Sequence, residues 1–368
     1  MSIRARYQLS NVINARGTFT PLGVSRSSPE VAAAVADALS DYFIIDELQL
    51  AARKALAEQT GAEAGAVVHC SAAGITLAVA ACMTGTSAER IAALPDATGM
   101  SNRVVLPAGH AVNYGQPILQ AIRLAGAAPV LAGSEAHCGL SDIEDALSHP
   151  ETSCLLLVSS RLSRGATVEL SAAVAAAHRR GVPALIDGAA QDMRMRSLVE
   201  TGADAVIVSA QKYLAAPTAG IVLGRDQLIQ ALLAQERGIG RAMKATKEAI
   251  VGVLAALDQR QRWDEITWSD AQSRKLTHFI ETVNGLSGVN ARAVPDLTGL
   301  PFARAHITLA PNRASLTAAV CAHRLRSGIP KIFVMDHRVS EGEIVLELVQ
   351  LRDDEIAVIS SRLAELLG

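Results

Sequence analysis

The chain has 368 residues, which is enough for one large domain and a smaller one, and half of the residues are apolar. Its formal net charge is −2, and its lysines and arginines are scattered along the sequence. Nucleic-acid-binding surfaces are basic, so a nucleic-acid partner is not expected. The five cysteines (Cys70, Cys82, Cys138, Cys154 and Cys321) show no C-x-x-C spacing. This pattern predicts buried thiols in a reducing, cytoplasmic compartment rather than a disulfide framework.

One apolar stretch, residues 66–85, is about as long as a membrane span. However, Ser71-Ala-Ala-Gly74 interrupts it, and alanine and glycine outnumber the large apolar residues. We interpret it as a strand, a tight turn and a buried helix. The N-terminus also lacks the apolar stretch of a signal peptide, so we expect a soluble protein without a membrane partner.

The first quarter of the chain reads as an arm followed by two helices. Residues 1–26 contain glycine and proline in a pattern that predicts an extended N-terminal arm with turns. Ser27-Ser-Pro-Glu30 has the spacing of a capping box and predicts a helix to about Leu39. Apolar periodicity predicts a second helix over 46–60.

From Ala66 onward, short apolar runs alternate with helical patterns. The expected strands are 66–69, 103–106, 128–131, 154–158, 183–186, 205–209 and 220–223, and the expected helices between them are 74–83, 115–124, 141–147 and 169–180. Such alternation predicts an α/β fold with a mainly parallel sheet sandwiched by helices. The last two strands are separated only by a loop, so they are either antiparallel neighbours or not adjacent.

These elements predict a large domain over residues 27–260. A helix over 248–257 precedes a charged helical connector over 260–283. After it come short apolar runs at 305–309 and 344–349 and two amphipathic helices at 315–327 and 353–367. We therefore expect residues 261–368 to form the connector helix and a small α+β C-terminal domain.

A lone carboxylate and a lone amine follow two of the expected strands. Asp187 ends the apolar run 182–186, and Lys212 lies three residues beyond the run 205–209. Open α/β sheets bind ligands outside the carboxyl ends of their strands. Pyridoxal phosphate needs such a pair, because a lysine bonds to its aldehyde as an imine and an aspartate keeps its pyridine nitrogen protonated. Either residue alone is more simply a turn cap or a solvated loop residue, but together they predict a pyridoxal phosphate site.

Other residues at the same expected edge could complete this site. Ser71–Gly74 opens a helix directly after the first core strand, and a helix N-terminus of this kind binds phosphate. His110 follows another strand and either stacks on the pyridine ring or only hydrogen-bonds within its loop. Ser160 and Arg161 follow the strand 154–158 and are candidates for contact with the ring hydroxyl or the substrate carboxylate.

Arginines are the natural clamps for anionic substrates because they bind carboxylate and phosphate bidentately. Arg16, Arg241 and Arg338 lie in turn-rich stretches and are further substrate candidates. The sequence has no H-E-x-x-H, paired Cys/His ligand set, G-x-G-x-x-G after a strand or G-x-S-x-G elbow. No metal site, dinucleotide site or hydrolase triad is therefore expected.

The sequence resembles the fold-type I pyridoxal phosphate enzymes (the PLP-dependent transferase fold), and in particular the group around bacterial selenocysteine synthase. Within that group it is most similar to the D-glucosaminate-6-phosphate ammonia-lyase-like proteins. The matching stretches are VINARGTFTPLG (12–23), TGAEA (60–64), SAAG (71–74), NYG (113–115), IDGAA (186–190), SAQKY (209–213), AGIVLG (219–224) and IGRAMKATKE (239–248). They span most of the first 260 residues in the family's order, whereas the last third of the chain matches only loosely.

The resemblance implies roles for residues of the site. Lys212 would be the imine lysine and Asp187 the partner of the pyridine nitrogen, with His110 close to the ring. Ser71, Ala72, Ala73, Gly74 and Ser209 would lie near the phosphate. It also implies a homodimer or larger assembly, in which the loop 238–247 with Gly240 reaches the neighbouring subunit's site. The family often has Gly-Gly-Pro-Gln after the lysine, where this chain has Tyr213-Leu-Ala-Ala-Pro-Thr, so the substrate does not carry over.

We expect a lyase that eliminates a β-leaving group, such as water, from a hydroxy-amino acid or amino-sugar acid and yields a 2-oxo acid and ammonia. An aminotransferase remains the main alternative, because both reactions begin with removal of the same α-proton. A non-catalytic protein that keeps the fold and binds a ligand is the alternative from another class. Selenium transfer on tRNA is disfavoured by the nearly neutral charge.

Overall fold

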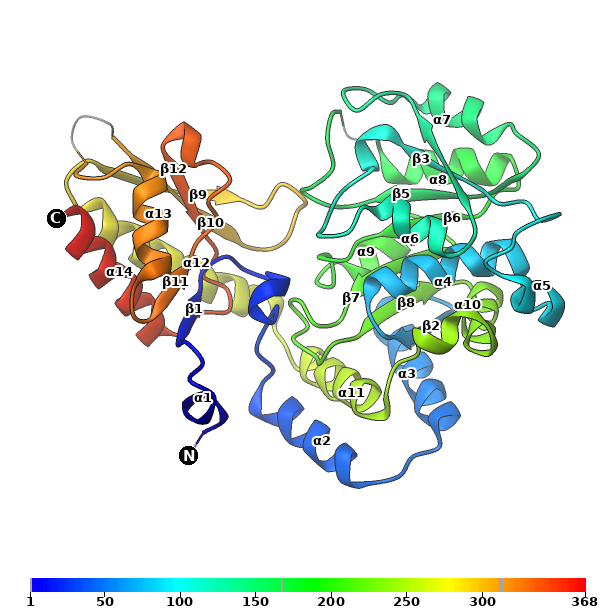
Figure 1. Cartoon of the computed structure of the whole chain (residues 1–368), viewed down its shortest axis with the longest axis horizontal. Helices are drawn as coiled ribbons and strands as arrows, with labels where there is room; N and C mark the ends of the chain where they lie inside the picture. Colours follow the sequence, from blue (N-terminus) through cyan, green and yellow to red (C-terminus); the bar gives the residue numbers. More distant parts are fainter. Residues whose placement is uncertain (1, 167, 311–313) are drawn as a thin grey trace. The chain divides into compact units, whose positions relative to one another are not determined.

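The computed structural model describes residues 2–166, 168–310 and 314–368. The chain divides into two compact units. The larger unit is formed by residues 27–262, and the smaller unit combines the first 26 residues with residues 263–368 (Figure 1).

A seven-stranded sheet forms the centre of the larger unit. Its order is β2 (Ala64–Val68), β8 (Gly220–Gly224), β7 (Ala205–Ser209), β6 (Ala184–Asp187), β5 (Thr152–Val158), β3 (Arg103–Pro107) and β4 (Ala128–Ala132). Strand β8 is antiparallel to both of its neighbours, and the pairs from β7 to β4 are parallel. The predicted parallel sheet is confirmed, with strand ends within two residues of those expected, and β7 and β8 are antiparallel neighbours.

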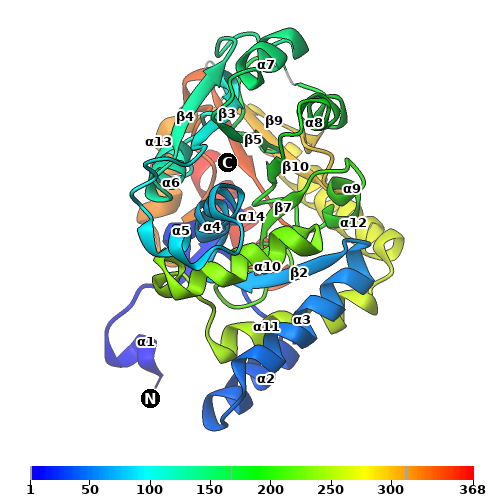
Figure 2. The same ribbon diagram turned by 90° about the vertical axis from the view of Figure 1, so that its right-hand side faces the viewer.

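Helices cover both faces of this sheet, and each face has its own hydrophobic cluster. One face is covered by α4 (Ser71–Thr84), α6 (Ile118–Leu124) and α10 (Asp226–Ala234). The other is covered by α3 (Ile45–Thr60), α7 (Leu140–Leu147), α8 (Leu170–Arg179), α9 (Met195–Val199) and α11 (Lys247–Gln261). Figure 2 shows α4 and α6 on one side of the strands and α8 and α9 on the other. The remaining helices of this unit are α2 (Pro29–Ser40) and α5 (Ala88–Ala93).

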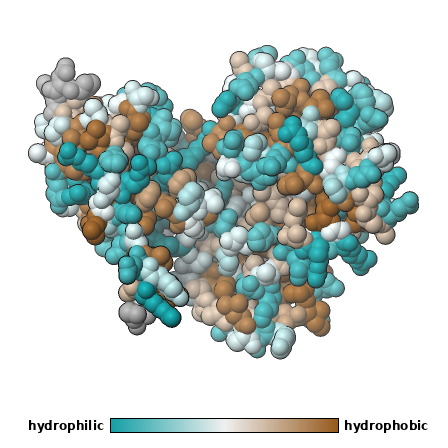
Figure 3. Space-filling model, in the orientation of Figure 1, coloured by the Kyte–Doolittle hydropathy of each residue, from teal (hydrophilic) through white to brown (hydrophobic). Residues whose placement is uncertain are grey.

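The apolar stretch 66–85 is the strand, turn and buried helix that its small residues predict. It comprises most of β2 and all of α4, whose residues are nearly all buried. No helix in the described parts of the chain is both long and apolar enough to cross a membrane. Over the visible face of each unit, hydrophilic and hydrophobic residues are interspersed (Figure 3).

The smaller unit is an α+β structure, as expected. Its antiparallel sheet has the order β12 (Glu343–Leu346), β10 (Ala303–Leu309), β9 (Val289–Pro295). Its main helices are α12 (Glu265–Asn284), α13 (Ala318–Ser327) and α14 (Asp353–Leu367). The N-terminal segment contains α1 (Ile3–Arg6) and β1 (Val12–Asn14), and β1 pairs in parallel with β11 (Lys331–Phe333). Residues 1–26 therefore contribute a strand to this unit and are not only an extended arm.

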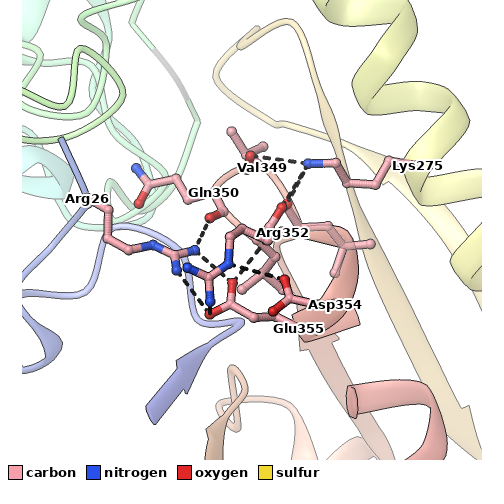
Figure 4. Close-up of polar contacts among 9 residues, drawn as sticks. Arg26, Lys275, Val349, Gln350, Arg352, Asp354 and Glu355 are labelled. Carbon is pink, nitrogen blue, oxygen red and sulfur yellow. Dashed lines mark hydrogen bonds and ion pairs between the residues drawn. The ribbon is translucent and has the colours of Figure 1, made fainter. Parts of the chain in front are cut away.

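A polar cluster fixes the end of the N-terminal segment to α14 within the smaller unit (Figure 4). The Arg26 guanidinium binds the Glu355 carboxylate through two nitrogens, at 2.8 and 3.0 Å, and also donates to the Gln350 carbonyl. The Lys275 amine donates to the carbonyls of Leu348 and Leu351, at 3.3 and 3.1 Å. Bidentate pairs of this kind fix orientation as well as distance.

Candidate active site

Asp187 is the last residue of β6, in the middle of the large sheet, and its side chain is buried. The Ala189 N–H donates to its Oδ1 at 3.1 Å, and its backbone carbonyl accepts from the Ser159 N–H at 2.8 Å. Burial raises the pKa of the Asp187 carboxyl to about 6, although the Lys212 charge and the Ala189 N–H act against this rise. The carboxylate is thus held, largely out of water, at the carboxyl edge of the sheet.

Lys212 lies in a tight turn directly after β7. The Ala215 N–H donates to the Lys212 carbonyl at 3.2 Å, and the Ala216 N–H donates to the Ala210 carbonyl at 3.0 Å. Burial lowers the pKa of the Lys212 amine, while the charges of Asp187 and Asp192 raise it. The structure therefore brings Lys212 and Asp187 into electrostatic contact, as the strand ends predicted.

The turn between β2 and α4 lies at the same edge. Cys70 precedes the helix, and its sulfur accepts from the Ala73 N–H at 3.5 Å. The first N–H groups of a helix have no acceptor within the helix and attract anions. A Cβ at Gly220 would lie 2.4 Å from the Cys70 carbonyl carbon and 2.7 Å from the Ser71 nitrogen, so the start of β8 touches this turn.

Strand pairing brings Ser209 to the same turn. Ser209 is the register partner of Gly220 across β7 and β8. It is 1% exposed, and its hydroxyl oxygen has no hydrogen-bond partner among the described residues. A buried hydroxyl of this kind is costly unless a ligand satisfies it. Ser71–Gly74 and Ser209, which were predicted to share one ligand group, therefore lie together.

His110 lies in a 3₁₀ turn after β3 and is buried. Its Nδ1 accepts from the Val158 N–H at 3.1 Å, and Val158 is the register partner of Asp187. Burial lowers the pKa of His110 to about 4, so the ring is neutral at pH 7, with its hydrogen on Nε2. His110 thus stands one strand away from Asp187 and is held in one tautomer.

The sequence did not single out two further residues of this region. The Tyr114 hydroxyl is buried without a hydrogen-bond partner in the described structure, and burial together with the charges of Asp187 and Cys70 raises its pKa. Asp192 is 1% exposed, and burial raises the pKa of its carboxyl to about 6. The signals available were the tyrosine in the N-Y-G stretch and the second acid of I-D-G-A-A-Q-D, but burial cannot be read from either motif.

The other candidates in the larger unit are Ser160, Arg161, Gly240 and Arg241, and they differ in exposure. The Ser160 hydroxyl accepts from the Leu162 N–H at 3.1 Å within its own turn. Arg161 is exposed, and its charge lowers the pKa of Lys212. Arg241 is also exposed. Gly240 is buried, and a side chain does not fit there, because a Cβ at this position would lie 2.7 Å from the Gln235 carbonyl.

Arg16 and Arg338 belong to the smaller unit, and both have carboxylate partners there. Arg16 pairs with Asp336 at 3.0 Å and lies 4.2 Å from the centroid of the Phe19 ring. Arg338 pairs with Glu341 and Glu343. An anionic substrate would have to compete with these carboxylates.

The residues at the edge of the large sheet fit pyridoxal phosphate. That molecule presents an aldehyde, a pyridine nitrogen and a phosphate. The edge presents the desolvated amine of the half-buried Lys212, the buried Asp187 carboxylate, and a helix N-terminus beside the Ser209 hydroxyl, which has no partner among the described residues. Each group of the cofactor would thus find a group of matching chemistry at this edge.

Several known proteins are similar to this chain in sequence, and a solved structure is similar to it in fold. The profile of the Beta-eliminating lyase family matches residues 37–307. The chain is 34% identical to the D-glucosaminate-6-phosphate ammonia lyase of Salmonella typhimurium, over 97% of this chain and 96% of the relative. It is also 34% identical to a 5'-C-glycyluridine monooxygenase-decarboxylase of a Streptomyces species, over 97% of this chain and 90% of the relative. A selenium transferase for L-seryl-tRNA(Sec) from Solidesulfovibrio magneticus is 28% identical, over 98% of this chain and 83% of the relative.

A solved structure of D-glucosaminate-6-phosphate ammonia-lyase superposes with a TM-score of 0.89 at 34% identity, and covers 100% of this chain and 98% of that one. The resemblance to this group and to the selenocysteine synthases is thereby confirmed. The chain belongs to the beta-eliminating lyase family and is a pyridoxal phosphate-dependent enzyme of fold type I.

Proposed function

We propose that this enzyme eliminates water from a hydroxy-amino acid or amino-sugar acid and releases a 2-oxo acid and ammonia. The observation that carries the proposal is the Asp187–Lys212 pair at the carboxyl edge of the sheet, in a chain 34% identical over nearly its whole length to an ammonia lyase that acts on D-glucosaminate-6-phosphate. Both the reaction and the acid-sugar substrate class are taken from that relative.

The proposed contacts assign one part of the cofactor to each group. The N–H groups of Ser71 and Ala72 and the Ser209 hydroxyl would hold the phosphate, because they are donors at one place. Ala73 and Gly74, whose N–H groups donate to the sulfur and carbonyl of Cys70, would line the same place. Asp187 would hold a proton on the pyridine nitrogen, and the neutral ring of His110 would pack against the pyridine. When bound, the cofactor supplies a ring that accepts the electron pair left on the substrate's α-carbon.

Lys212 is proposed as both the attachment point and the base. An amine must be unprotonated to take a proton, and the burial that lowers the pKa of Lys212 favours that form. The Lys212 Nζ would take the proton from the α-carbon and then deliver it to the departing β-hydroxyl. The hydroxyl leaves as water, and the unsaturated amine that remains is hydrolysed to the 2-oxo acid and ammonia.

Arginine contacts to the substrate are also proposals. Arg161 has the best support, because its charge acts on Lys212 and its side chain is exposed. Ser160 precedes it in the same turn. Arg16, Arg241 and Arg338 remain candidates for a substrate's distal anionic group, since each is an arginine in a turn-rich stretch.

Replacement of the lysine tests the proposal. In Lys212→Ala, release of ammonia and 2-oxo acid from a panel of D- and L-hydroxy-amino acids and amino-sugar acids should fall by at least about 100-fold, because the base is lost. Borohydride treatment should no longer fix the cofactor to the chain, as measured by mass spectrometry. Lys54→Ala, at an exposed lysine on α3, is the control and should keep both properties. Full activity of Lys212→Ala would contradict the proposal.

A second reaction has support from the Streptomyces relative, whose name describes a monooxygenase-decarboxylase. The two reactions can be distinguished by experiment, because elimination needs no oxygen and releases no carbon dioxide. Activity that survives removal of oxygen and yields ammonia supports the lyase. Activity that needs oxygen and yields carbon dioxide supports the other reaction, and transfer of the amino group to the cofactor without ammonia release identifies an aminotransferase.

We further propose that the protein forms a homodimer or larger assembly, in which the loop 238–247 reaches the neighbouring site. An exposed apolar segment supports this: Tyr42 and Ile44, in the connection between α2 and α3, are 103% and 63% exposed. Leu39, Phe43 and Leu50 extend it. A cytoplasmic location is proposed as well, with support from the five cysteines, all of which are free thiols.

A further inference from the structure

Asp192 is a buried acid without an obvious structural purpose. Its side chain is fully buried, in the loop that follows β6. Neither carboxylate oxygen makes a hydrogen bond of standard geometry within the described residues. The Arg260 guanidinium lies beside it, with Nη2 3.9 Å from Oδ2. Burying a carboxylate so incompletely paired costs stability.

Arg260 connects this acid to the lysine turn. It lies near the end of α11, and its Nη2 donates to the carbonyl of Tyr213 at 2.9 Å. The same guanidinium therefore faces both the Asp192 carboxylate and the backbone of the residue that follows Lys212. The backbone N–H groups of Tyr213 and Leu214 also favour the charged form of Asp192. Asp192 and Arg260 thus enclose the turn from two different elements.

The turn needs such support because part of it is strained. Ala215 has φ +56°, in the left-handed region where residues with a Cβ pay about 1–2 kcal/mol. The Ser27 hydroxyl holds the Ala215 carbonyl at 2.7 Å. The hydrogen bond from Arg260 to the Tyr213 carbonyl holds the turn at a second point, next to Lys212.

Three charged side chains act on the Lys212 amine: Asp187, Asp192 and Arg161. The two carboxylates favour the protonated amine, and Arg161 disfavours it. In the proposed function, Asp187 binds the pyridine nitrogen of the cofactor. Asp192 is therefore the remaining carboxylate whose charge can offset the lowering of the Lys212 pKa by burial.

We propose that Asp192, held by Arg260, is a positioning residue for Lys212: it anchors the turn 212–216 and supplies the negative charge that sets the protonation of the lysine amine. The proposal rests on the role proposed for Lys212. It predicts that loss of the Asp192 charge makes the amine lose its proton at lower pH, because an opposite charge close by favours the charged form.

The test measures the amine directly, in the full chain freed of cofactor. Lys212 is labelled with acetic anhydride between pH 6 and 10, and the modified peptide is quantified by mass spectrometry. In Asp192→Asn the midpoint of labelling should move to lower pH, with labelling at neutral pH faster by about tenfold. A turn that is merely loosened would expose the amine to water, which would move the midpoint to higher pH, because burial is what lowers the pKa of Lys212. An unchanged midpoint would overturn the proposal.

Companion variants keep the test decisive if Asp192→Asn does not fold. Arg260→Gln removes the countercharge and raises the pKa of Asp192 further, so the carboxylate carries less charge near neutral pH and labelling there should be faster, whereas Arg260→Lys keeps the charge and should restore the wild-type rate. Asp204→Asn is the matched control, since Asp204 is a largely buried carboxylate paired with Arg225 and His178 before β7. Labelling does not use the cofactor, so its failure is distinct from failure of the Lys212→Ala experiment.

Discussion

Asp187 makes the unliganded protein sensitive to pH. Its carboxyl has a pKa of about 6 in the folded chain, above the ordinary 3.8, because it is buried. Between these values the folded protein holds a proton that the unfolded chain has released. The free energy of unfolding should therefore fall as pH rises from about 4 to about 6, by up to about 1.4 kcal/mol per pH unit.

Asp187→Asn removes this contribution. The stability of the variant relative to the wild type should increase as pH rises through that range and become constant above it. Urea unfolding of both proteins without cofactor, at pH 4.5, 5.5, 6.5 and 7.5, measures the difference. A difference that is independent of pH would mean that the Asp187 carboxyl is not desolvated in the folded chain.

Residues at strand ends were predictable, and residues positioned by distant elements were not. Asp187 and Lys212 stand at the ends of apolar runs, and parallel strands bring such ends to one edge. Asp192 gives no comparable signal, since its burial and its partner depend on Arg260 in α11. Tyr114 is similar, because the burial of its hydroxyl near the Asp187 charge depends on how the loop after β3 folds.

At the scale of elements, the close approach of β8 to the turn before α4 is the contact that forms the proposed phosphate site. Gly220→Ala should disturb it, because the new Cβ would lie 2.4 Å from the Cys70 carbonyl carbon. We expect a loss of about 1–3 kcal/mol in unfolding free energy from overpacking, together with weaker cofactor binding in an absorbance titration. Gly139→Ala is the control, since its Cβ would meet nothing closer than 3.6 Å. Equal cofactor affinity in Gly220→Ala and the wild type would contradict the proposed phosphate site.

Strongly patterned elements were predicted, some with the right ends, whereas two short helices were missed; the helix expected over 248–257 extends to Gln261 in α11. Strand 205–209 and helix 353–367 match β7 and α14 at both ends. The five-residue α9 and six-residue α5 are too short to show helical periodicity. The helix expected from Gly115 begins only at Ile118, because Asn113 and Gly115 form a turn closed by the Asn113 side chain at 2.9 Å.

At the scale of the whole molecule, the proposed assembly depends on the exposed apolar segment after α2. Charges in this segment should separate the subunits, because an interface cannot bury them without partners. Tyr42→Asp combined with Ile44→Asp should weaken self-association at least about 100-fold, as expected for two anchor residues. Light scattering after size-exclusion chromatography measures the mass. Leu124→Asp, at an exposed leucine of α6, is the control.

A wild-type protein that is already monomeric would contradict the assembly. A double variant that keeps the wild-type mass while its circular dichroism is unchanged would contradict the role of the apolar segment in the interface. Either result would leave the apolar segment without a subunit to cover it.

The pairing of β1 with β11 has a consequence for biosynthesis. Strand β1 leaves the ribosome before the larger unit, but its partner, Lys331–Phe333, emerges only after the entire larger unit has been made. Domains fold as units during translation. The larger unit can therefore fold while β1 is still unpaired, and the smaller unit completes its fold only after the segments on both sides of the larger unit have been synthesised.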